Sequence, residues 1–277
     1  MYRKYFIDIY LANEFSFEEA KTEVNFVIET LFNYTYKDFI LDKILEPWQL
    51  IKIEKVIKER VKTHRPIQQI IGQAYFYGRK FFVNQFTLIP RPETEILVSE
   101  VLALCQNFQN PKILDIGSGT GCIPITLILE NSDITAHSID ISQEALEISK
   151  KNALFHNVLN NISFFKSNLF ENVNEKYNII VSNLPYIPLK DKENLQIEVR
   201  DFEPQSALYT NDEYGIEFYE KIIKQAGNYL INDGYLAFEF GLNQFDMIFK
   251  LLKNYGFSSI EKIKDFNGIE RVTICKK

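Results

Sequence analysis

The fold is decided by the stretch Lys112-Ile113-Leu114-Asp115-Ile116-Gly117-Ser118-Gly119-Thr120-Gly121. A short apolar run of strand type is followed by glycine at every second position, and helix-type spacing begins at Gly121. Glycine accepts the backbone angles of a tight turn and carries no side chain, so a ligand can lie against the main chain at the start of the helix. The stretch therefore predicts a strand, a ligand-binding loop and a helix. A plain glycine turn is the alternative.

Downstream of this stretch, strand-type and helix-type segments alternate to the end of the chain. This pattern predicts an α/β fold with a Rossmann-like, mainly parallel sheet of seven strands. We expect strands over residues 112–116, 134–139, 162–165, 177–182, 235–240, 257–263 and 270–275. We expect helices over residues 121–130, 142–154, 215–231 and 243–255. Because no helix fits between the last two strands, this pair is predicted to be antiparallel.

Upstream, apolar residues recur at helical intervals. Ser16 has the position of a capping residue, which predicts a helix over residues 17–32. A second helix is expected through residues 40–45, ending at Pro47, and a third through residues 53–61, ending before the next proline. These segments predict a small helical bundle without strands.

Three parts are expected along the chain. An N-terminal helical domain covers residues 1–70, a connecting β-hairpin covers 71–90, and an α/β domain covers 91–277. The hairpin is predicted from dense aromatic residues interrupted by Gly78-Arg79-Lys80. The α/β domain opens with a helix that runs to about residue 106. We expect the helical domain to be a substrate-recognition domain that helps to hold a large substrate, and a purely stabilising role is the alternative.

Composition narrows the class of protein. The 277 residues are 46% hydrophobic, which is ample for two packed domains. No apolar run approaches the roughly 20 residues of a membrane span, and the start lacks the features of a signal peptide, so we expect a cytoplasmic protein. The net charge is -6, which disfavours binding to bulk nucleic acid. A protein or small-molecule substrate is expected.

Cysteine and histidine give no sign of a metal site or a disulfide. Three residues of each type are widely spaced along the chain, at Cys105, Cys122, Cys275, His64, His137 and His156. Their spacing matches neither a metal-ligand pattern nor a disulfide framework. We therefore expect no metal.

Asp115 and the glycine spacing separate two kinds of cofactor. A dinucleotide site wants the spacing G-x-G-x-x-G, but the third glycine falls one position early at Gly121, and Cys122 holds the expected place. A carboxylate is a poor neighbour for pyrophosphate and a good one for a cationic amino-acid group. The loop therefore favours S-adenosylmethionine over NAD, with Asp115 and Gly117-Ser118-Gly119-Thr120-Gly121 as cofactor-binding residues.

Two more polar residues follow predicted strands. Asp140 ends the second strand of the sheet, where its carboxylate can accept both hydroxyl hydrogens of a ribose. It can instead cap the next helix, although Ser142 can do that itself. Asn168 follows the third strand, where it can hydrogen-bond the edge of an adenine or simply form a turn.

The tetrapeptide Asn183-Leu184-Pro185-Tyr186 stands where the fourth strand ends, at the edge where open α/β sheets bind ligands. The side-chain oxygen of Asn183 and the carbonyl of Leu184 can accept the two hydrogens of a planar NH2 group. Pro185 and Tyr186 can supply apolar faces on which a flat amide or base stacks. A strand followed by a proline turn is the other interpretation.

With the glycine loop, Asp140 and this tetrapeptide in order on successive strand ends, the chain resembles a class I S-adenosylmethionine-dependent methyltransferase acting on a planar nitrogen. Further motifs narrow the resemblance: Ile89-Pro90-Arg91-Pro92-Glu93-Thr94-Glu95, Glu198-Val199-Arg200-Asp201-Phe202-Glu203-Pro204, Ala207-Leu208, and Phe238-Glu239-Phe240-Gly241 with Gln244. Together they look like the release factor glutamine methyltransferase (HemK/PrmC) family, closely over residues 65–277.

The resemblance implies methyl transfer to the side-chain amide nitrogen of the glutamine in the Gly-Gly-Gln motif of bacterial peptide chain release factors, with S-adenosyl-L-methionine as cofactor. It implies that Asn183, Leu184, Pro185 and Tyr186 are the catalytic residues and that Asn183 also borders the cofactor. The expected partner is a release factor rather than nucleic acid or a membrane, and a monomer is expected. The family usually has proline at Leu184 and aspartate at Asn168, and neither change removes an acceptor oxygen.

Other functions are compatible with these motifs. They are a glutamine methyltransferase for a ribosomal protein, a methyltransferase for the amino group of adenine in DNA, and a cofactor-binding module without catalysis. A DNA enzyme needs a basic surface or a target-recognition domain, and the sequence suggests neither. Arg91, Thr94 and Glu95 are expected either to organise the wall of the pocket or only to support it.

Overall fold

The computed structural model describes residues 2–41 and 43–277. The chain forms two compact units, one of Met1–Gln73 with Gln196–Phe202 and one of Ala74–Leu195 with Glu203–Lys277. We call them the helical unit and the sheet unit. Because the segment Gln196–Phe202 groups with the N-terminal helices, the chain passes between the units three times, after residues 73, 195 and 202. The sequence did not predict that residues 196–202 belong to the helical unit.

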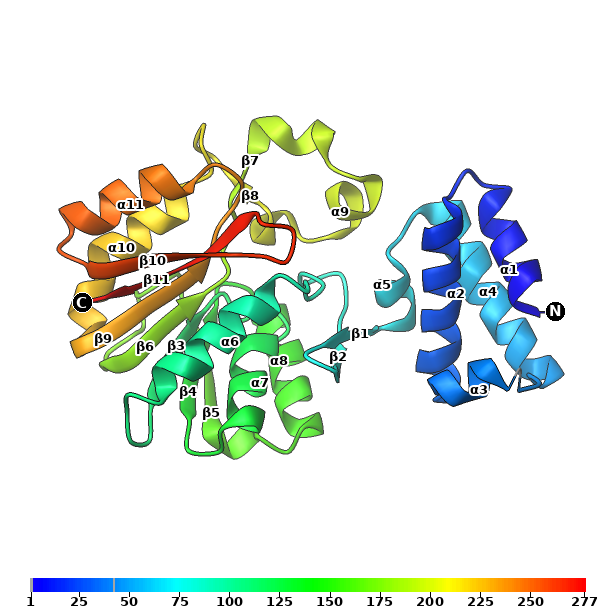
Figure 1. Cartoon of the computed structure of the whole chain (residues 1–277), viewed down its shortest axis with the longest axis horizontal. Helices are drawn as coiled ribbons and strands as arrows, with labels where there is room; N and C mark the ends of the chain where they lie inside the picture. The colour runs from blue at the N-terminus through cyan, green and yellow to red at the C-terminus, as the bar shows by residue number, and fades with distance from the viewer. Residues whose placement is uncertain (1, 42) are drawn as a thin grey trace. The chain divides into compact units, whose positions relative to one another are not determined.

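The helical unit contains six helices among the described residues (Figure 1). They are α1 (Tyr2–Leu11), α2 (Phe17–Phe32), α3 (Tyr36–Ile40), α4 (Pro47–Thr63), α5 (Ile67–Ile71) and α9 (Ile197–Phe202). Helix α2 has the predicted bounds, and Ser16 caps it because its Oγ accepts a hydrogen bond from the Glu19 N–H at 3.2 Å.

The predicted helix through residues 40–45 is wrong over most of its length. Helix α3 ends at Ile40, and the described residues 43–46 are not helical. Pro47 begins α4 instead of ending the helix before it. Proline suits the first position of a helix because the N–H that it lacks has no partner there. The backbone N–H of Glu46 is satisfied by the Gln49 side chain at 2.8 Å.

A buried cation lies in the helical unit. The Arg60 side chain on α4 is 2% exposed, and it donates hydrogen bonds to Glu23 at 3.0 Å, Glu19 at 3.1 Å and Glu198 at 2.8 Å. Its guanidinium also lies 4.7 Å from the centre of the Phe15 ring. Since a buried charge is costly unless it is paired, these carboxylates hold Arg60 in place and join α9 to α2 and α4.

The predicted hairpin is formed by β1 (Gln73–Phe76) and β2 (Arg79–Phe82), and the sheet unit begins at the second residue of β1. The helices that follow are α6 (Thr94–Cys105), α7 (Cys122–Glu130), α8 (Gln143–Phe155), α10 (Glu217–Tyr229) and α11 (Phe245–Asn254). The strands of the large sheet are β3 (Lys112–Ile116), β4 (Thr135–Asp140), β5 (Ile162–Lys166), β6 (Tyr177–Ser182), β9 (Leu230–Glu239), β10 (Ser258–Lys264) and β11 (Glu270–Lys276). All seven predicted strands are present within a few residues, except that β9 begins five residues early.

The seven strands form one sheet in the order β10-β11-β9-β6-β3-β4-β5. Neighbours from β9 to β5 run parallel, whereas β11 is antiparallel to both β9 and β10. The predicted α/β class and the antiparallel last pair are therefore confirmed. The strand order reverses beside β3, which has β4 on one side and β6 on the other. Ligands bind at such a point in open α/β sheets.

Helices cover both faces of the sheet (Figure 1). Successive strand residues alternate between two hydrophobic cores, as the two-residue period of a strand requires. Ile113 and Ile179 pack with residues of α6 and α7 in one core, whereas Leu114 and Ile180 pack with residues of α10 and α11 in the other. Because both faces are covered, the middle of each of these strands is a run of apolar residues, which is why the sequence revealed them so clearly.

One region between β6 and α10 has elements too short to predict. It contains β7 (Ile187–Pro188) paired in parallel with β8 (Tyr209–Thr210), the 3-10 helices η2 (Leu189–Asn194) and η3 (Gln205–Ala207), and α9. A further 3-10 turn, η1 (Leu159–Asn161), precedes β5. Among the described residues, no helix is long and apolar enough to cross a membrane.

Candidate functional site

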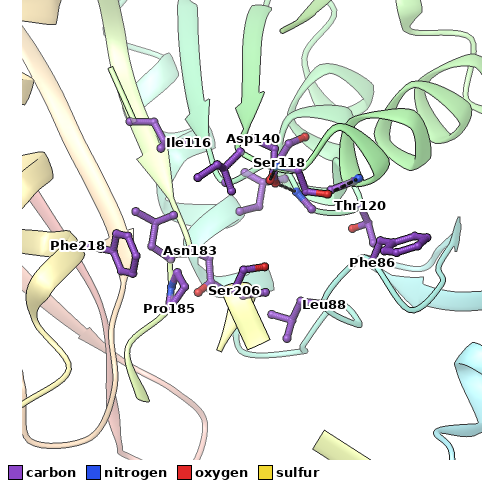
Figure 2. Close-up of a pocket in the computed structure, with 18 of the residues that line it drawn as sticks. Phe86, Leu88, Ile116, Ser118, Thr120, Asp140, Asn183, Pro185, Ser206 and Phe218 are labelled. Atoms are coloured by element: carbon purple, nitrogen blue, oxygen red, sulfur yellow. Dashed lines mark hydrogen bonds between the residues drawn. The ribbon is translucent and has the colours of Figure 1, made fainter. Parts of the chain in front are cut away.

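A cavity of about 320 Å³ opens at the carboxyl edge of the sheet (Figure 2). Its walls include the residues that directly follow β3, β4, β5 and β6, so it lies at the predicted edge and spans the reversal of strand order. Its volume is in the range of small-molecule sites. All of its lining residues belong to the sheet unit.

The glycine loop after β3 turns sharply into α7. Gly117 and Gly119 have φ angles of 83° and 54°, which non-glycine residues rarely adopt. The Gly117 N–H donates to the Ile139 carbonyl at 2.9 Å, and the Gly119 N–H donates to Asp140 Oδ2 at 2.9 Å. A Cβ at Gly117 would lie 2.7 Å from Cδ2 of Leu184. The loop therefore depends on glycine both for its backbone angles and for space.

Buried hydroxyl groups hold the loop from below. Ser138 Oγ lies at hydrogen-bond distance, 2.7 Å, from Ser118 Oγ, and Ser149 Oγ donates to the Gly119 carbonyl at 2.8 Å. The Asn152 side chain donates to the Thr120 carbonyl at 2.9 Å. These contacts come from β4 and α8 and fix the main chain of the loop before any ligand arrives.

Asp115 lies beneath the loop rather than on the cavity wall. Its side chain is 1% exposed, and Oδ2 accepts a hydrogen bond from Ser138 Oγ at 2.7 Å. Its other oxygen is buried and has no hydrogen-bond partner among the described residues. Burial raises the pKa of Asp115 to about 7. A positive ligand above the loop would favour the ionised carboxylate. Gly121 likewise does not line the cavity.

Asp140 and Asn168 both line the cavity. Each carboxylate oxygen of Asp140 accepts one backbone hydrogen bond, Oδ1 from Ser142 at 2.8 Å and Oδ2 from Gly119 at 2.9 Å, which leaves further lone pairs for ribose hydroxyls. The side chain of Ser142 caps α8, so Asp140 is not needed as the cap of this helix. Asn168 donates its NH2 group to Glu171 Oε1 at 2.9 Å, so its side-chain oxygen can accept from a ligand.

The tetrapeptide is divided between the cavity and the core. Asn183, Leu184 and Pro185 line the cavity, and Figure 2 shows Asn183 and Pro185 on its wall. The Leu184 side chain is 8% exposed and packs in the core beneath them. Tyr186 does not line the cavity, and its hydroxyl donates to Glu239 at 3.4 Å. The geometry therefore offers Pro185, but not Tyr186, as a stacking face.

The cavity also has walls that sequence reasoning did not assign to it. They are formed by Phe86, Leu88, Ser206, Ala207, Tyr209, Asn211 and Phe218. Phe86 and Leu88 follow the aromatic-rich hairpin, and this density of large apolar side chains could have indicated a wall of the cavity. Arg91, which is expected at the pocket wall, does line the cavity, and its Nη2 donates to both carboxylate oxygens of Glu203 at 2.7 Å.

Glu95 and Thr94, the other polar residues expected at the pocket wall, differ in position. Glu95 does not line the cavity and accepts a hydrogen bond from the Tyr77 N–H at 2.7 Å, whereas Thr94 does line it. In the part of the chain that the structure describes, no group of three or more His, Cys, Asp or Glu residues has the arrangement of a metal site.

Comparison with known proteins agrees with this geometry. The family model described as "Methyltransferase small domain" matches residues 92–200. The crystal structure of a ribosomal protein L11 methylase from Lactobacillus delbrueckii subsp. bulgaricus superposes with a TM-score of 0.51 at 18% identity, covering 69% of this chain and 82% of that chain. The fold and the cavity define a class I methyltransferase, the S-adenosylmethionine-dependent class.

Curated relatives narrow the class. A release factor glutamine methyltransferase from Flavobacterium psychrophilum is 36% identical over 98% of this chain and 96% of its own length. Another from Fusobacterium nucleatum subsp. nucleatum is 41% identical over 82% of this chain, which spans 64% of that protein. The chain belongs to the release factor glutamine methyltransferase family.

Proposed function

We propose that the protein transfers a methyl group from S-adenosylmethionine to the side-chain amide nitrogen of the glutamine in the Gly-Gly-Gln motif of bacterial class I release factors. The observation that carries this proposal is the shared cavity. Asn183, Leu184 and Pro185 line the same space as Gly117–Thr120 and Asp140, so an acceptor nitrogen and a cofactor can meet there. The names of the relatives support the choice of substrate.

The residues present fit the proposed cofactor. A Cβ at Gly119 would meet nothing closer than the Gly117 carbonyl oxygen at 4.0 Å, so the loop has an open surface on which a ligand can lie. The buried carboxylate of Asp115, which has one unpartnered oxygen, complements a cation. Asp140 would hold the ribose, and the Asn168 side-chain oxygen would accept from the adenine amino group. When bound, S-adenosylmethionine supplies an electrophilic methyl group.

The tetrapeptide would act by positioning the substrate. A carboxamide nitrogen is a weak nucleophile because its lone pair is delocalised, so its orientation matters. Asn183 Oδ1 and the Leu184 carbonyl would accept the two amide hydrogens, while Pro185 stacks against the amide plane. Together they would aim the nitrogen lone pair at the methyl carbon. Orientation of this kind can contribute up to roughly 7 to 11 kcal/mol in ideal cases.

The cavity argues for positioning rather than for base catalysis. Among the described residues that line it, Asp140 is the sole carboxylate and there is no histidine. Both oxygens of Asp140 already accept backbone hydrogen bonds, and its place suits the ribose rather than the acceptor. The amide would therefore keep both hydrogens during the transfer. The nitrogen–methyl bond would replace the sulfur–methyl bond, whose electron pair stays on the leaving sulfur, and the surplus proton would then pass to solvent.

The helical unit would bind the release factor. Large apolar side chains are exposed on and between α3 and α4, at Tyr36, Ile40, Leu41, Ile44, Trp48 and Ile51. Exposed apolar side chains gathered on adjoining elements are typical of protein-binding surfaces. On this proposal the protein works as a cytoplasmic monomer, and the helical unit supplies affinity while the sheet unit performs the transfer.

The test is methyl transfer from labelled S-adenosylmethionine to a class I release factor, to its Gly-Gly-Ala variant, to ribosomal protein and to DNA, each assayed separately. We expect label in the release factor alone and none in the Gly-Gly-Ala variant. Asn183→Ala should abolish single-turnover transfer and leave cofactor binding intact, whereas Asn254→Ala, at an exposed position on α11, should match the unaltered protein. Label only in ribosomal protein or DNA would refute the proposal.

A further inference from the structure

Behind the tetrapeptide, three side chains form a chain of hydrogen bonds that leads into the core. Asn183 Nδ2 donates to Thr94 Oγ1 at 3.0 Å, and Thr94 Oγ1 donates to Glu239 Oε2 at 2.6 Å. The side chains of Thr94 and Glu239 are 3% and 2% exposed. Thr94 is the first residue of α6, and Glu239 ends β9, the strand beside β6. The chain therefore joins three separate elements directly behind the acceptor site.

The chemistry of these groups fixes the direction of each bond. An ionised carboxylate can only accept hydrogen bonds, so the single proton of the Thr94 hydroxyl must point to Glu239. The Thr94 oxygen is then left as an acceptor, and only the NH2 end of the Asn183 amide can satisfy it. The carbonyl end of that amide must point away from Thr94. Because Asn183 lines the cavity, its oxygen is the end available to a ligand.

We propose that Thr94 and Glu239 are positioning residues that lock the Asn183 side chain with its oxygen toward the acceptor, and that this lock makes the site select a carboxamide over a carboxylate. The inference rests on the proposed function and deepens it. A glutamine presents NH2 hydrogens, which the Asn183 oxygen accepts. A glutamate presents only acceptor oxygens and would be repelled. If the amide could rotate, its NH2 end would face the substrate and would favour the wrong side chain.

Tyr186 is hydrogen-bonded to the same carboxylate, that of Glu239, and this contact accounts for its position outside the cavity. Its hydroxyl donates to the second oxygen of Glu239 at 3.4 Å. Its backbone carbonyl accepts a hydrogen bond from the Gln244 side chain at 2.8 Å, and Gln244 also accepts from the Gly241 N–H at 2.8 Å. The backbone that follows Asn183 is thus anchored at Tyr186 to Glu239, the carboxylate that also orients the Asn183 side-chain amide through Thr94.

The lock depends on the ionised form of Glu239. Burial raises the pKa of this carboxyl and the charge of Glu93 adds to the rise, whereas the Thr94 hydroxyl and the charge of Arg271 oppose it. The titratable and charged groups that act on this carboxyl from the surrounding elements are Glu93, Tyr186 and Arg271, and the Tyr219 hydroxyl donates to the backbone carbonyl of Glu239. A protonated Glu239 can donate to Thr94, which frees the threonine proton for the amide oxygen and permits the rotated amide. Selection of carboxamide should therefore weaken as the pH falls.

The experiment compares two ligands on each variant: a release factor with Gly-Gly-Gln and the same factor with Gly-Gly-Glu. Thr94→Val removes the hydroxyl at nearly constant volume, Thr94→Ser keeps it, and Glu239→Gln introduces a donor. Binding of S-adenosylmethionine, measured by calorimetry, reports whether each variant is folded. We measure single-turnover methylation of the first factor and the ratio of the two factors' dissociation constants.

We expect Thr94→Val and Glu239→Gln to slow methylation by about ten- to a hundredfold, to keep cofactor affinity, and to move the ratio of dissociation constants toward unity. Thr94→Ser should restore both rate and ratio. Because the glutamate of the second factor also titrates, the ratio should shrink at low pH in both proteins, but it should shrink more in the unaltered protein than in Glu239→Gln. Equal weakening of both factors, or an unchanged ratio in both variants, would overturn the lock alone. Failure of the unaltered protein to methylate Gly-Gly-Gln would overturn the proposed function with it.

Discussion

Gly117 and Leu184 should be coupled, and alanine at both positions tests this. Alanine at Gly117 is strained because the φ angle is 83°, which costs roughly 1 to 2 kcal/mol for a residue with a Cβ. That Cβ would lie 2.7 Å from Leu184 Cδ2, well inside the usual contact of roughly 3.5 to 4.0 Å. Overpacking of this kind adds roughly 1 to 3 kcal/mol. Gly117→Ala should therefore destabilise the sheet unit by about 3 kcal/mol.

Leu184→Ala should cost a similar amount for a different reason. The side chain is 8% exposed, and truncation of a buried leucine to alanine costs about 2 to 5 kcal/mol. The same truncation removes the atom against which the new Cβ would press. In the double variant only the backbone strain at Gly117 is left to add, so its free energy of unfolding should exceed the additive value by about 1 to 2 kcal/mol.

The assay is hydrogen exchange by mass spectrometry on the peptides that cover β3 and β6, across a urea series. Trp48 lies on α4 in the helical unit and is the chain's only tryptophan, so its fluorescence is an internal control for that unit. Recovery of S-adenosylmethionine affinity in the double variant would show that the loop regains its shape. Additivity of the two changes within about 0.5 kcal/mol would refute the proposed contact.

Three other changes test separate parts of the structure. Arg60→Met should destabilise the helical unit by about 3 kcal/mol because it leaves Glu198 and two other carboxylates without their cation. Trp48 fluorescence in urea would measure this loss, and Lys62→Met, at an exposed position, is the control. Burial raises the pKa of Asp115 to about 7, so S-adenosylmethionine should bind about tenfold more tightly at pH 8, where this carboxyl is ionised, than at pH 6, where it is neutral. Calorimetry should find that Asp115→Asn removes this pH dependence, and a persisting dependence would assign it to another group. Leu184→Pro keeps the carbonyl that the mechanism needs, so its single-turnover rate should stay within about threefold of the unaltered protein, and a loss as large as that of Asn183→Ala would contradict the carbonyl's role.

Much of the sheet unit could be predicted because its strands are buried on both faces and its helices have clear starts. The bounds of β3 and β6 were right to the residue. Pro47 misled the prediction because a proline can either end a helix or occupy its first position, and the apolar residues on both sides suit either case. Strands of two residues, such as β7 and β8, have no periodicity to detect.

The site could be predicted to the level of strand ends but not of side-chain directions. Asp140, Asn168 and Asn183 were expected at the carboxyl edge and do line one cavity. Asp115 and Tyr186 were expected there too, but their side chains point into the core, where each has a buried hydrogen-bond partner. Direction depends on contacts with residues far away in the sequence, which a local motif does not contain.

Because residues 196–202 belong to the helical unit, they constrain which segments of this protein recombination can exchange between relatives. A recombination event that replaced only the first 73 residues would pair a foreign α4 with the resident α9. The partner of Glu198 is Arg60, at 2.8 Å, so these two positions, 138 residues apart, have to be exchanged together or change in step. Successful exchange of the helical unit between relatives therefore requires two crossovers around α9 in addition to the one near residue 73.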